Sequence, residues 1–274
     1  MRADLHIHTN ASHGIWSVLD VYDYVRRNDI ELFSITEQDF PRTLRVPQDL
    51  ARRYIPGVEL TVRIDDRNVH LLIYGALDAR SDLAVTLSGQ RRRRVRHIEQ
   101  MLVRLAEHNI VVTLADVRRQ TTVENRTLCT VHVARALVNS RIASTVEEAF
   151  DRYLSPGAPA HVPLNGIASS DAVRMAHTAG AVVVAAHPTR LQRPDDLDRL
   201  RRDGIDGIEV WHPSADRGAA HRLQQYAARW DLLQTAGSDA GCDSKAVLRQ
   251  HEFRREWVEA GMRALLMGRH FCDG

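Results

Sequence analysis

Short apolar or β-branched runs alternate along the chain with longer amphipathic stretches, and this alternation limits the possible folds more than any other feature. Strands that alternate with helices indicate βα units and a parallel sheet. At 274 residues, the chain is long enough for one large domain or for one domain with a substantial insertion. We therefore expect a parallel α/β barrel. Its expected strands lie at residues 3–8, 32–36, 55–60, 69–74, 182–187, 207–212 and 232–238.

Two stretches between the expected strands have clear helical signals. Apolar residues recur at helical spacing over residues 18–25, as in a helix that covers the outside of a barrel. Another helix is expected over residues 170–179, with Ser169 as its N-cap and Gly180 as its C-terminal stop.

The alternation of strands and helices stops between residues 83 and 160, where the pattern indicates consecutive helices without strands. Thr145 and Glu148 have the spacing of a capping box at the start of one of these helices. The expected division is therefore a barrel formed by residues 1–82 and 161–274 and a helical insertion formed by residues 83–160.

Composition excludes several classes of protein. No apolar stretch approaches the roughly 20 residues that span a bilayer, and the N-terminus lacks the pattern of a secretion signal. We expect a cytoplasmic protein with no membrane partner. The three cysteines are far apart and form no CxxC pair, so neither a disulfide framework nor a cysteine zinc cluster is indicated. A net charge of +2 gives no strong signal for nucleic acid, and the oligomeric state cannot be inferred.

The first strand carries two histidines at alternate positions, His6 and His8. Residues i and i+2 of a strand point to the same side, so both imidazoles can bind one ion. Buried histidines that only satisfy backbone groups are an equally good explanation of this pair on its own. Glu59 follows an apolar run, where an unpaired carboxylate would be costly and a divalent cation would compensate its charge.

Three further side chains occupy comparable positions: His70, His187 and Asp239. Each alone is more often a structural residue than a ligand. Ligand groups in parallel α/β folds gather where strands end, and four histidines with two carboxylates at such positions favour a metal centre.

The chain as a whole resembles the PHP (polymerase and histidinol phosphatase) superfamily of metal-dependent phosphoesterases, nearest the nucleotide-hydrolysing branch with a helical insertion. The motifs that carry this resemblance are D-L-H-I-H-T-N-A-S-H-G at 4–14, G-V-E-L at 57–60, the histidine at 70, A-H-P at 186–188, G-I-E-V at 207–210 and G-S-D at 237–239.

This resemblance implies a distorted (β/α)7 barrel that binds divalent transition metals, namely manganese, iron or zinc. Glu59 would bridge two ions, one of which His6, His8 and Asp239 would also hold. His70 and His187 would complete the second. A hydroxide that bridges such a pair would attack the phosphate ester.

Three positions that hold a third ion in the family differ here. They are His13, Gln38 and Gly241. His13 still offers a nitrogen, but an amide is a weak ligand and glycine has no side chain. We therefore expect a vacant or labile third site, although Glu37 and Asp39 are acids close to it in sequence.

The insertion also departs from the family, because Thr130-Val131-His132 replaces R-P-H. Arg126 lies four residues upstream and is the expected substitute phosphate ligand. Gln38 and Ser238 are the other expected substrate-binding residues. The arginine-rich run at 91–97 is more typical of a solvated helix face than of a phosphate-binding patch.

Three histidines are candidates for proton transfer: His13, His132 and His212. A helix-capping contact for His132 and a packing role for His212 are the alternatives. The leading hypothesis is hydrolysis of a small phosphomonoester or phosphodiester, such as a nucleotide or a biosynthetic intermediate. The alternatives are a hydrolase of a non-phosphate bond on the same metals and a catalytically silent binding protein.

Overall fold

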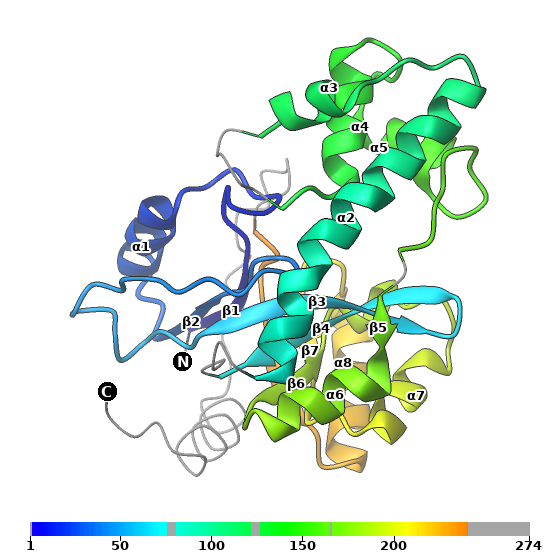
Figure 1. The fold of residues 1–274 in the computed structure, drawn as a ribbon. Helices are drawn as coiled ribbons and strands as arrows, with labels where there is room; N and C mark the ends of the chain where they lie inside the picture. Colours follow the sequence, from blue (N-terminus) through cyan, green and yellow to red (C-terminus); the bar gives the residue numbers. More distant parts are fainter. Residues whose placement is uncertain (1, 76–80, 122–126, 165, 241–274) are drawn as a thin grey trace.

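The computed structural model describes residues 2–75, 81–121, 127–164 and 166–240. They form a mixed α/β fold with a central sheet and flanking helices (Figure 1). Along the chain the elements are β1 (Ala3–Ile7), α1 (Val18–Arg27), β2 (Leu32–Ile35), β3 (Gly57–Ile64), β4 (Arg67–Tyr74), α2 (Asp82–Glu107), α3 (Leu114–Arg119), α4 (Thr130–Asn139), α5 (Val146–Ala149), the π-helical turn η1 (Phe150–Leu154), β5 (Ile167–Ala168), α6 (Ser169–Thr178), β6 (Val182–Ala185), the 3-10 turn η2 (Pro188–Arg190), α7 (Asp196–Asp203), β7 (Gly207–Trp211), α8 (Arg217–Arg229) and β8 (Leu233–Ala236).

The strands form two sheets that isolated bridges connect. β1 and β2 pair in parallel, and the larger sheet has the order β5-β3-β4-β6-β7-β8. Beyond β8, Ala240 bridges to Ile7 of β1, and beyond β2, Gln38 bridges to Glu59 of β3. The segment that follows β2 therefore lies next to β3, and the segment that follows β8 lies next to the end of β1.

The expectation that the sheet is parallel throughout is wrong at two places. β3 and β4 form an antiparallel hairpin, and β4 also pairs antiparallel with β6. Only Asp65 and Asp66 separate β3 from β4, and a parallel connection needs a crossover of about a dozen residues or more. Asp65 adopts the left-handed conformation, with a φ of 51°, that a tight turn uses.

Alternate residues of the β3–β4 hairpin pack into two different hydrophobic clusters. Val58 and Leu60 belong to a cluster that includes buried residues of α2 and α6, whereas Leu72 belongs to a cluster with Leu5 of β1. Because Glu59 pairs directly with Leu72 in the hairpin register, its side chain points to the same side as Leu72. This alternation directs Glu59 toward β1.

The helix predictions are largely correct, and two of the capping predictions need correction. Ser17 caps α1 in a full capping box with Asp20. α6 begins one residue earlier than expected, because the Ser169 hydroxyl donates to Asp203 and Ala168 takes the N-cap position. Thr145 caps α5, but the Glu148 carboxylate accepts from the Ser144 amide, so the capping box is incomplete.

The described residues between 82 and 160 form helices and contain no strand. α3, α4 and α5 lie together at one end of the molecule, and α2 extends from the sheet to them (Figure 1). The first part of α2 packs on the sheet through Leu83 and Leu87. Its second part joins a separate hydrophobic cluster with α4, in which Ile98 and Leu137 are fully buried.

The interpretation of residues 91–97 as a solvated face is wrong for Arg94 and His97, which are both buried. Arg94 Nε lies 2.5 Å from Asp39 Oδ2, and its NH2 group donates to Thr61 Oγ1 at 2.7 Å. His97 Nε2 contacts the carbonyl oxygen of Val162 at 2.6 Å. Arg94 therefore attaches α2 to the loop after β2 and to β3, and His97 attaches it to the segment before β5.

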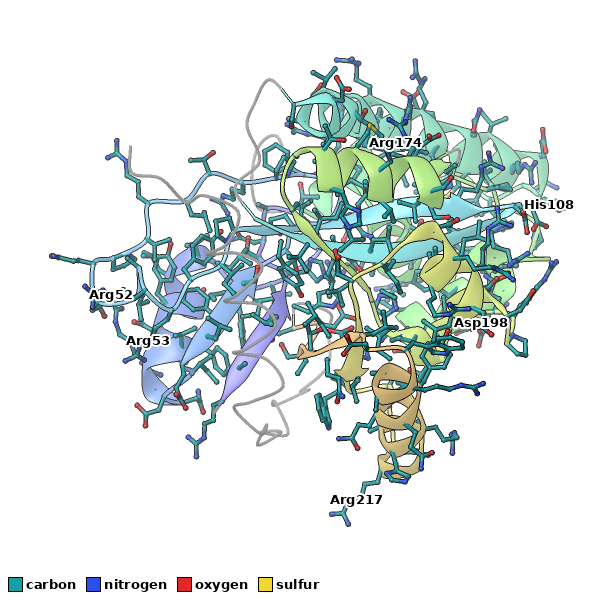
Figure 2. The ribbon with its side chains drawn as sticks, turned by 90° about the horizontal axis from the view of Figure 1, so that it is seen from below. Arg52, Arg53, His108, Arg174, Asp198 and Arg217 are labelled. Carbon is teal, nitrogen blue, oxygen red and sulfur yellow. The ribbon has the colours of Figure 1, made fainter. Side chains whose placement is uncertain are left out.

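Charged side chains cover the outside of the molecule, where Arg52, Arg174 and Arg217 extend into solvent (Figure 2). His108 is exposed at the end of α2 (Figure 2). Within the described ranges, no helix is both long and apolar enough to cross a membrane.

Candidate metal centre

His6 and His8 point to the same side of the chain, as their alternate positions predict. Both side chains are fully buried, and their Nε2 atoms lie 3.1 Å apart. Two imidazole nitrogens this close on one strand can share a cation.

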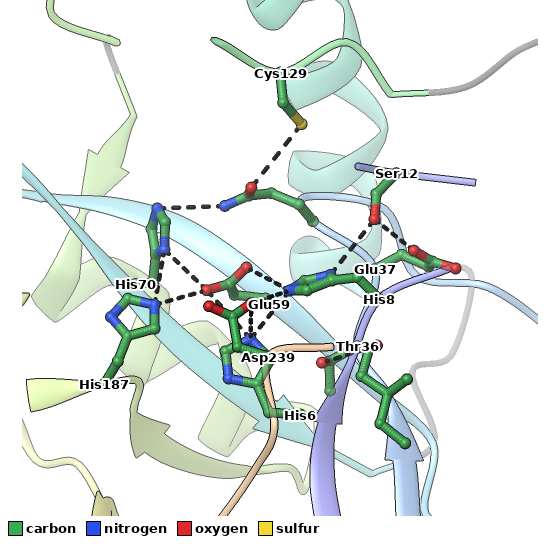
Figure 3. A network of polar contacts seen from close by, with 12 residues as sticks. His6, His8, Ser12, Thr36, Glu37, Glu59, His70, Cys129, His187 and Asp239 are labelled. Atoms are coloured by element: carbon green, nitrogen blue, oxygen red, sulfur yellow. Dashed lines mark hydrogen bonds and ion pairs between the residues drawn. The ribbon is translucent and has the colours of Figure 1, made fainter. Parts of the chain in front are cut away.

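Glu59 is the central carboxylate of the site (Figure 3). Its oxygens lie 3.5 Å from His6 Nε2 and 3.3 Å from His8 Nε2 on one side. On the other side, Glu59 Oε1 lies 2.8 Å from His70 Nδ1 and 3.1 Å from His187 Nε2. One carboxylate therefore contacts four imidazoles from three separate parts of the chain.

Asp239 completes the group on the side of His6 and His8. Its Oδ1 lies 3.4 Å from His8 Nε2 and 3.8 Å from His6 Nε2. Its amide donates to the backbone carbonyl of His6, which fixes the loop after β8 against β1. Gly237 permits this approach, because a Cβ atom there would lie 2.1 Å from the Cβ atom of His6.

The six side chains thus form two donor groups that share Glu59. The first contains His6, His8, Glu59 and Asp239, and the second contains Glu59, His70 and His187. Neutral nitrogens combined with carboxylate oxygens suit manganese, iron or zinc better than calcium, which prefers oxygen alone. The residues present therefore fit a divalent transition-metal centre.

The expectation that Glu59 ends its strand is wrong, because Glu59 is the third residue of β3 and the strand continues to Ile64. His70, which was expected within the run at 69–74, is the fourth residue of β4. They reach the site because they are diagonal neighbours on one face of the hairpin, where Thr61 rather than Glu59 pairs with His70. His187 does follow a strand, and it adopts a left-handed conformation with a φ of 30°.

The electrostatics of this buried group favour bound positive charge. Burial opposes ionisation of Glu59 and Asp239, but the surrounding imidazoles lower the pKa of both carboxyl groups well below their usual range. Burial also opposes a charge on His8, yet Asp239 and Glu59 raise its pKa to about 9. Cation binding would therefore displace protons from the imidazoles, because a ligating histidine must be neutral.

Glu209, in the G-I-E-V motif of β7, is a site residue that the sequence analysis did not assign. Its Oε1 lies 3.1 Å from His6 Nδ1, and its Oε2 accepts from the His187 amide at 2.7 Å. A carboxylate on the second ring nitrogen fixes the tautomer and orientation of a metal-binding histidine. A buried acid within an apolar strand was the available signal, because such a charge needs a partner.

Glu209→Gln is expected to lower the affinity for divalent cations by about 10- to 100-fold, because His6 loses its anionic partner. Titration of chelator-treated protein with Mn²⁺ measures this change, with Glu99→Gln on the exposed face of α2 as the matched control. Equal affinities for Glu209→Gln and the control would show that Glu209 does not act through His6.

Of the three positions at which a third ion was expected to be weakly held, His13 alone offers a good donor among the described residues. His13 forms a group with His8 and Asp239 within ligand distance, and its Nδ1 has no hydrogen-bond partner among the described residues. Gln38 Nε2 lies 3.2 Å from Thr61 Oγ1 and 3.3 Å from His70 Nε2. Gly241 lies outside the described residues.

The two nearby acids are engaged by other partners. Glu37 accepts from the amide and hydroxyl of Thr9 and from the Ser12 hydroxyl. Asp39 accepts from the Thr61 amide and from Arg94. Both carboxylates thus bind protein donors instead of pointing at His13.

The remaining candidates for proton transfer and substrate binding differ in whether they contact the six candidate metal ligands. His212 contacts them directly, with Nε2 3.3 Å from Asp239 Oδ2 and Nδ1 2.7 Å from Ser214 Oγ. His132 Nδ1 accepts from the Cys129 amide, which is the helix-capping contact considered as an alternative. The Ser238 hydroxyl points to backbone groups, at 3.5 Å from the His6 carbonyl and 3.1 Å from the Ala240 amide. Arg126 lies outside the described residues.

No family model matches the chain, but several known proteins are similar to it over most of their length. The chain is 31% identical to the 3',5'-nucleoside bisphosphate phosphatase of Chromobacterium violaceum over 245 residues, and this aligned region covers 86% of each chain. It is 27% identical to the phosphoribosyl 1,2-cyclic phosphate 1,2-diphosphodiesterase of Eggerthella lenta, over 87% of this chain and 94% of the relative. A 5'-3' exoribonuclease of Haemophilus influenzae is 24% identical over 94% of this chain and 92% of its own length.

A solved structure with a similar fold comes from Bifidobacterium adolescentis. That protein, described as a metal-dependent phosphoesterase, is 27% identical and superposes with a TM-score of 0.83 over 97% of this chain and 95% of its own.

Proposed function

The chain belongs to the PHP superfamily of metal-dependent phosphoesterases, and from this premise we propose that it hydrolyses a phosphate ester of a small pentose-containing molecule with two divalent cations. The observation that carries the proposal is the position of Glu59, which contacts imidazoles of both donor groups. A carboxylate between two such groups suits a pair of cations at close distance. Manganese, iron and zinc are the candidate metals.

The residues of the chain have separate roles in this proposal. His6, His8 and Asp239 would hold one cation with Glu59, and Glu59, His70 and His187 would hold the other. Such a pair would supply an activated water nucleophile and positive charge for the phosphate oxygens. A third cation site around His13 and Gln38 is proposed to be vacant or labile, because these two residues offer one good ligand.

Proton transfer is assigned to the histidines beside the donors. His212, which contacts Asp239 and the Ser214 hydroxyl, is the best-placed proton donor for the leaving group. The His13 ring centroid lies 4.0 Å from that of His8, with the two rings tilted by 42°, and His13 is proposed to bind or protonate substrate. His132, on α4, has one ring nitrogen committed to the Cys129 amide, so its proposed contact with substrate uses the other nitrogen.

The names of the three relatives support the substrate class. They denote a nucleoside bisphosphate, a phosphoribosyl cyclic phosphate and RNA, which all carry phosphate on a pentose. We propose a nucleotide-sized substrate, with Gln38, Ser238 and Arg126 among the residues that contact it. The fold proposed for this function is a distorted (β/α)7 barrel, supported by the bridges from Gln38 to Glu59 and from Ala240 to Ile7. Residues 83–160 would form the insertion above it.

The test is phosphate release by protein purified without chelators, stripped of metal and reloaded with Mn²⁺, Fe²⁺ or Zn²⁺. Substrates are a 3',5'-nucleoside bisphosphate, a nucleoside monophosphate, a ribose cyclic phosphate, a short RNA and a carboxylic ester. We expect turnover of at least one pentose phosphate, its loss on stripping and its return with metal. Metal-dependent hydrolysis of the carboxylic ester alone would overturn the phosphoesterase assignment, and so would a complete lack of turnover by the metal-loaded protein.

A further inference from the structure

One arginine reaches the donor groups, and neither the family motifs nor the proposed roles account for it. Arg190 NH1 donates to Asp239 Oδ2 at 2.9 Å. Among the described residues, Arg190 is the one arginine whose ion pair includes a candidate metal ligand. Asp239 Oδ1 faces His6 and His8, whereas Oδ2 contacts both Arg190 and His212.

Arg190 lies on the side of the site that solvent can reach. The side chains of His6 and His8 are fully buried, whereas those of His70 and Asp239 are 30% and 12% exposed. The Arg190 side chain itself is 52% exposed. The guanidinium therefore lies at the solvent-exposed edge of Asp239.

The backbone holds Arg190 in this place. Arg190 ends the 3-10 turn η2, which starts directly after His187, and its amide donates to the His187 carbonyl at 2.9 Å. Pro188 begins the turn and restricts its conformation. The turn that carries a candidate metal ligand thus also fixes the arginine.

The guanidinium has further N–H groups that a substrate could bind. An arginine has five N–H groups in a planar fork. Arg190 contacts Asp239 through NH1, and its side chain has no other side-chain partner among the described residues. A guanidinium that is anchored at one nitrogen on a half-exposed side chain suits a phosphate oxygen.

The number of phosphate oxygens distinguishes two substrate classes. A phosphodiester has two nonbridging oxygens and a single negative charge, whereas a phosphomonoester has three and carries a second charge near neutral pH. If each of two cations binds one nonbridging oxygen, only a monoester has a third nonbridging oxygen that the arginine can bind. We propose that Arg190 binds this third oxygen and makes the site selective for phosphomonoesters over phosphodiesters, an inference that rests on the proposed two-cation phosphoesterase function.

The test compares Arg190→Gln and Arg190→Lys with Arg193→Gln, which removes an exposed arginine from the same loop. Equilibrium binding of inorganic phosphate and of dimethyl phosphate to Mn²⁺-loaded protein is measured, together with metal content. Turnover of p-nitrophenyl phosphate, a monoester, and of bis(p-nitrophenyl) phosphate, a diester, gives the selectivity of catalysis. The Arg190→Lys variant keeps the positive charge but lacks the planar set of N–H donors of arginine.

Arg190→Gln is expected to weaken phosphate binding by about 10- to 100-fold, the effect of one hydrogen bond between charged groups. Dimethyl phosphate binding and metal content should be unchanged, and the preference for the monoester should fall by the same factor. Arg190→Lys should lie between wild type and Arg190→Gln, and Arg193→Gln should match wild type.

Three results would overturn the inference: equal losses for both anions, no loss for either, or a loss of metal that shows Arg190 only orients Asp239. Wild-type protein that cleaves the diester in preference to the monoester would contradict the selectivity but leave the phosphoesterase function intact. If wild-type protein cleaves neither compound nor any pentose phosphate, the proposed function fails, and the two binding measurements still decide whether Arg190 distinguishes the anions.

Discussion

Glu59→Gln is expected to abolish turnover and to weaken cation binding at both donor groups. The substitution keeps the shape of the side chain but removes the negative charge that four imidazoles surround. Removal of a residue that hydrogen-bonds to a metal ligand lowers metal affinity about 10- to 100-fold. Removal of a carboxylate that itself binds both cations should lower the affinity more. The measurements are metal content after dialysis and the rate of phosphate release.

Glu147→Gln is the matched control for this experiment, because Glu147 is exposed on α5. It should retain the metal content and rate of wild type. A Glu59→Gln protein that binds as much metal as wild type would show that Glu59 is not the shared ligand, even if turnover were lost.

Arg94→Met is expected to destabilise the fold by about 3–5 kcal/mol, the usual cost of leaving one member of a buried ion pair without its partner. Asp39 is fully buried and accepts a hydrogen bond from Arg94 Nε. In the variant its carboxylate would remain buried without a positive charge beside it. Thr61 Oγ1 would also lose a donor. The midpoint of urea unfolding measures the change in the free energy of unfolding.

Arg92→Met provides the control, since Arg92 is exposed on the same helix. The double variant Arg94→Met, Asp39→Asn should recover part of the loss, because it removes the unpaired charge as well. If Arg94→Met and Arg92→Met unfold at the same urea concentration, the buried ion pair contributes nothing to stability.

The ion pair also shows where sequence reasoning reached its limit. Helical periodicity identifies the two sides of α2 but not what covers them, and here a loop and a strand far away in sequence cover Arg94. The arginine-rich composition of residues 91–97 favoured a solvated face. Burial of an arginine depends on a tertiary partner, which no local pattern contains.

The strands themselves were predictable from apolar runs, but their directions were not. The expected run at 55–60 overlaps β3, which begins at Gly57, continues to Ile64 and leaves two residues before β4. Once the boundary is known, the short connection requires an antiparallel hairpin. β5 has two residues, Ile167 and Ala168, and is too short for a periodic signal.

The candidate donors were predictable because chelation restricts residue type and spacing. His6 and His8 are two residues apart on one strand, and Glu59 is a carboxylate in an apolar run. Glu209 and Arg190 could not be assigned in the same way, because their roles depend on contacts with His6 and Asp239 across the fold. A lone acid or arginine near a motif has many possible partners.

The central claim is that two cations lie side by side with Glu59 between them, and the electron paramagnetic resonance spectrum of Mn²⁺-loaded protein tests it most directly. Two Mn²⁺ ions joined by a carboxylate are magnetically coupled. We therefore expect the many-line spectrum of a coupled pair at two equivalents of Mn²⁺ per chain, and its absence in Glu59→Gln. The six-line spectrum of isolated ions at that ratio, or a spectrum of free Mn²⁺ alone, would contradict the claim.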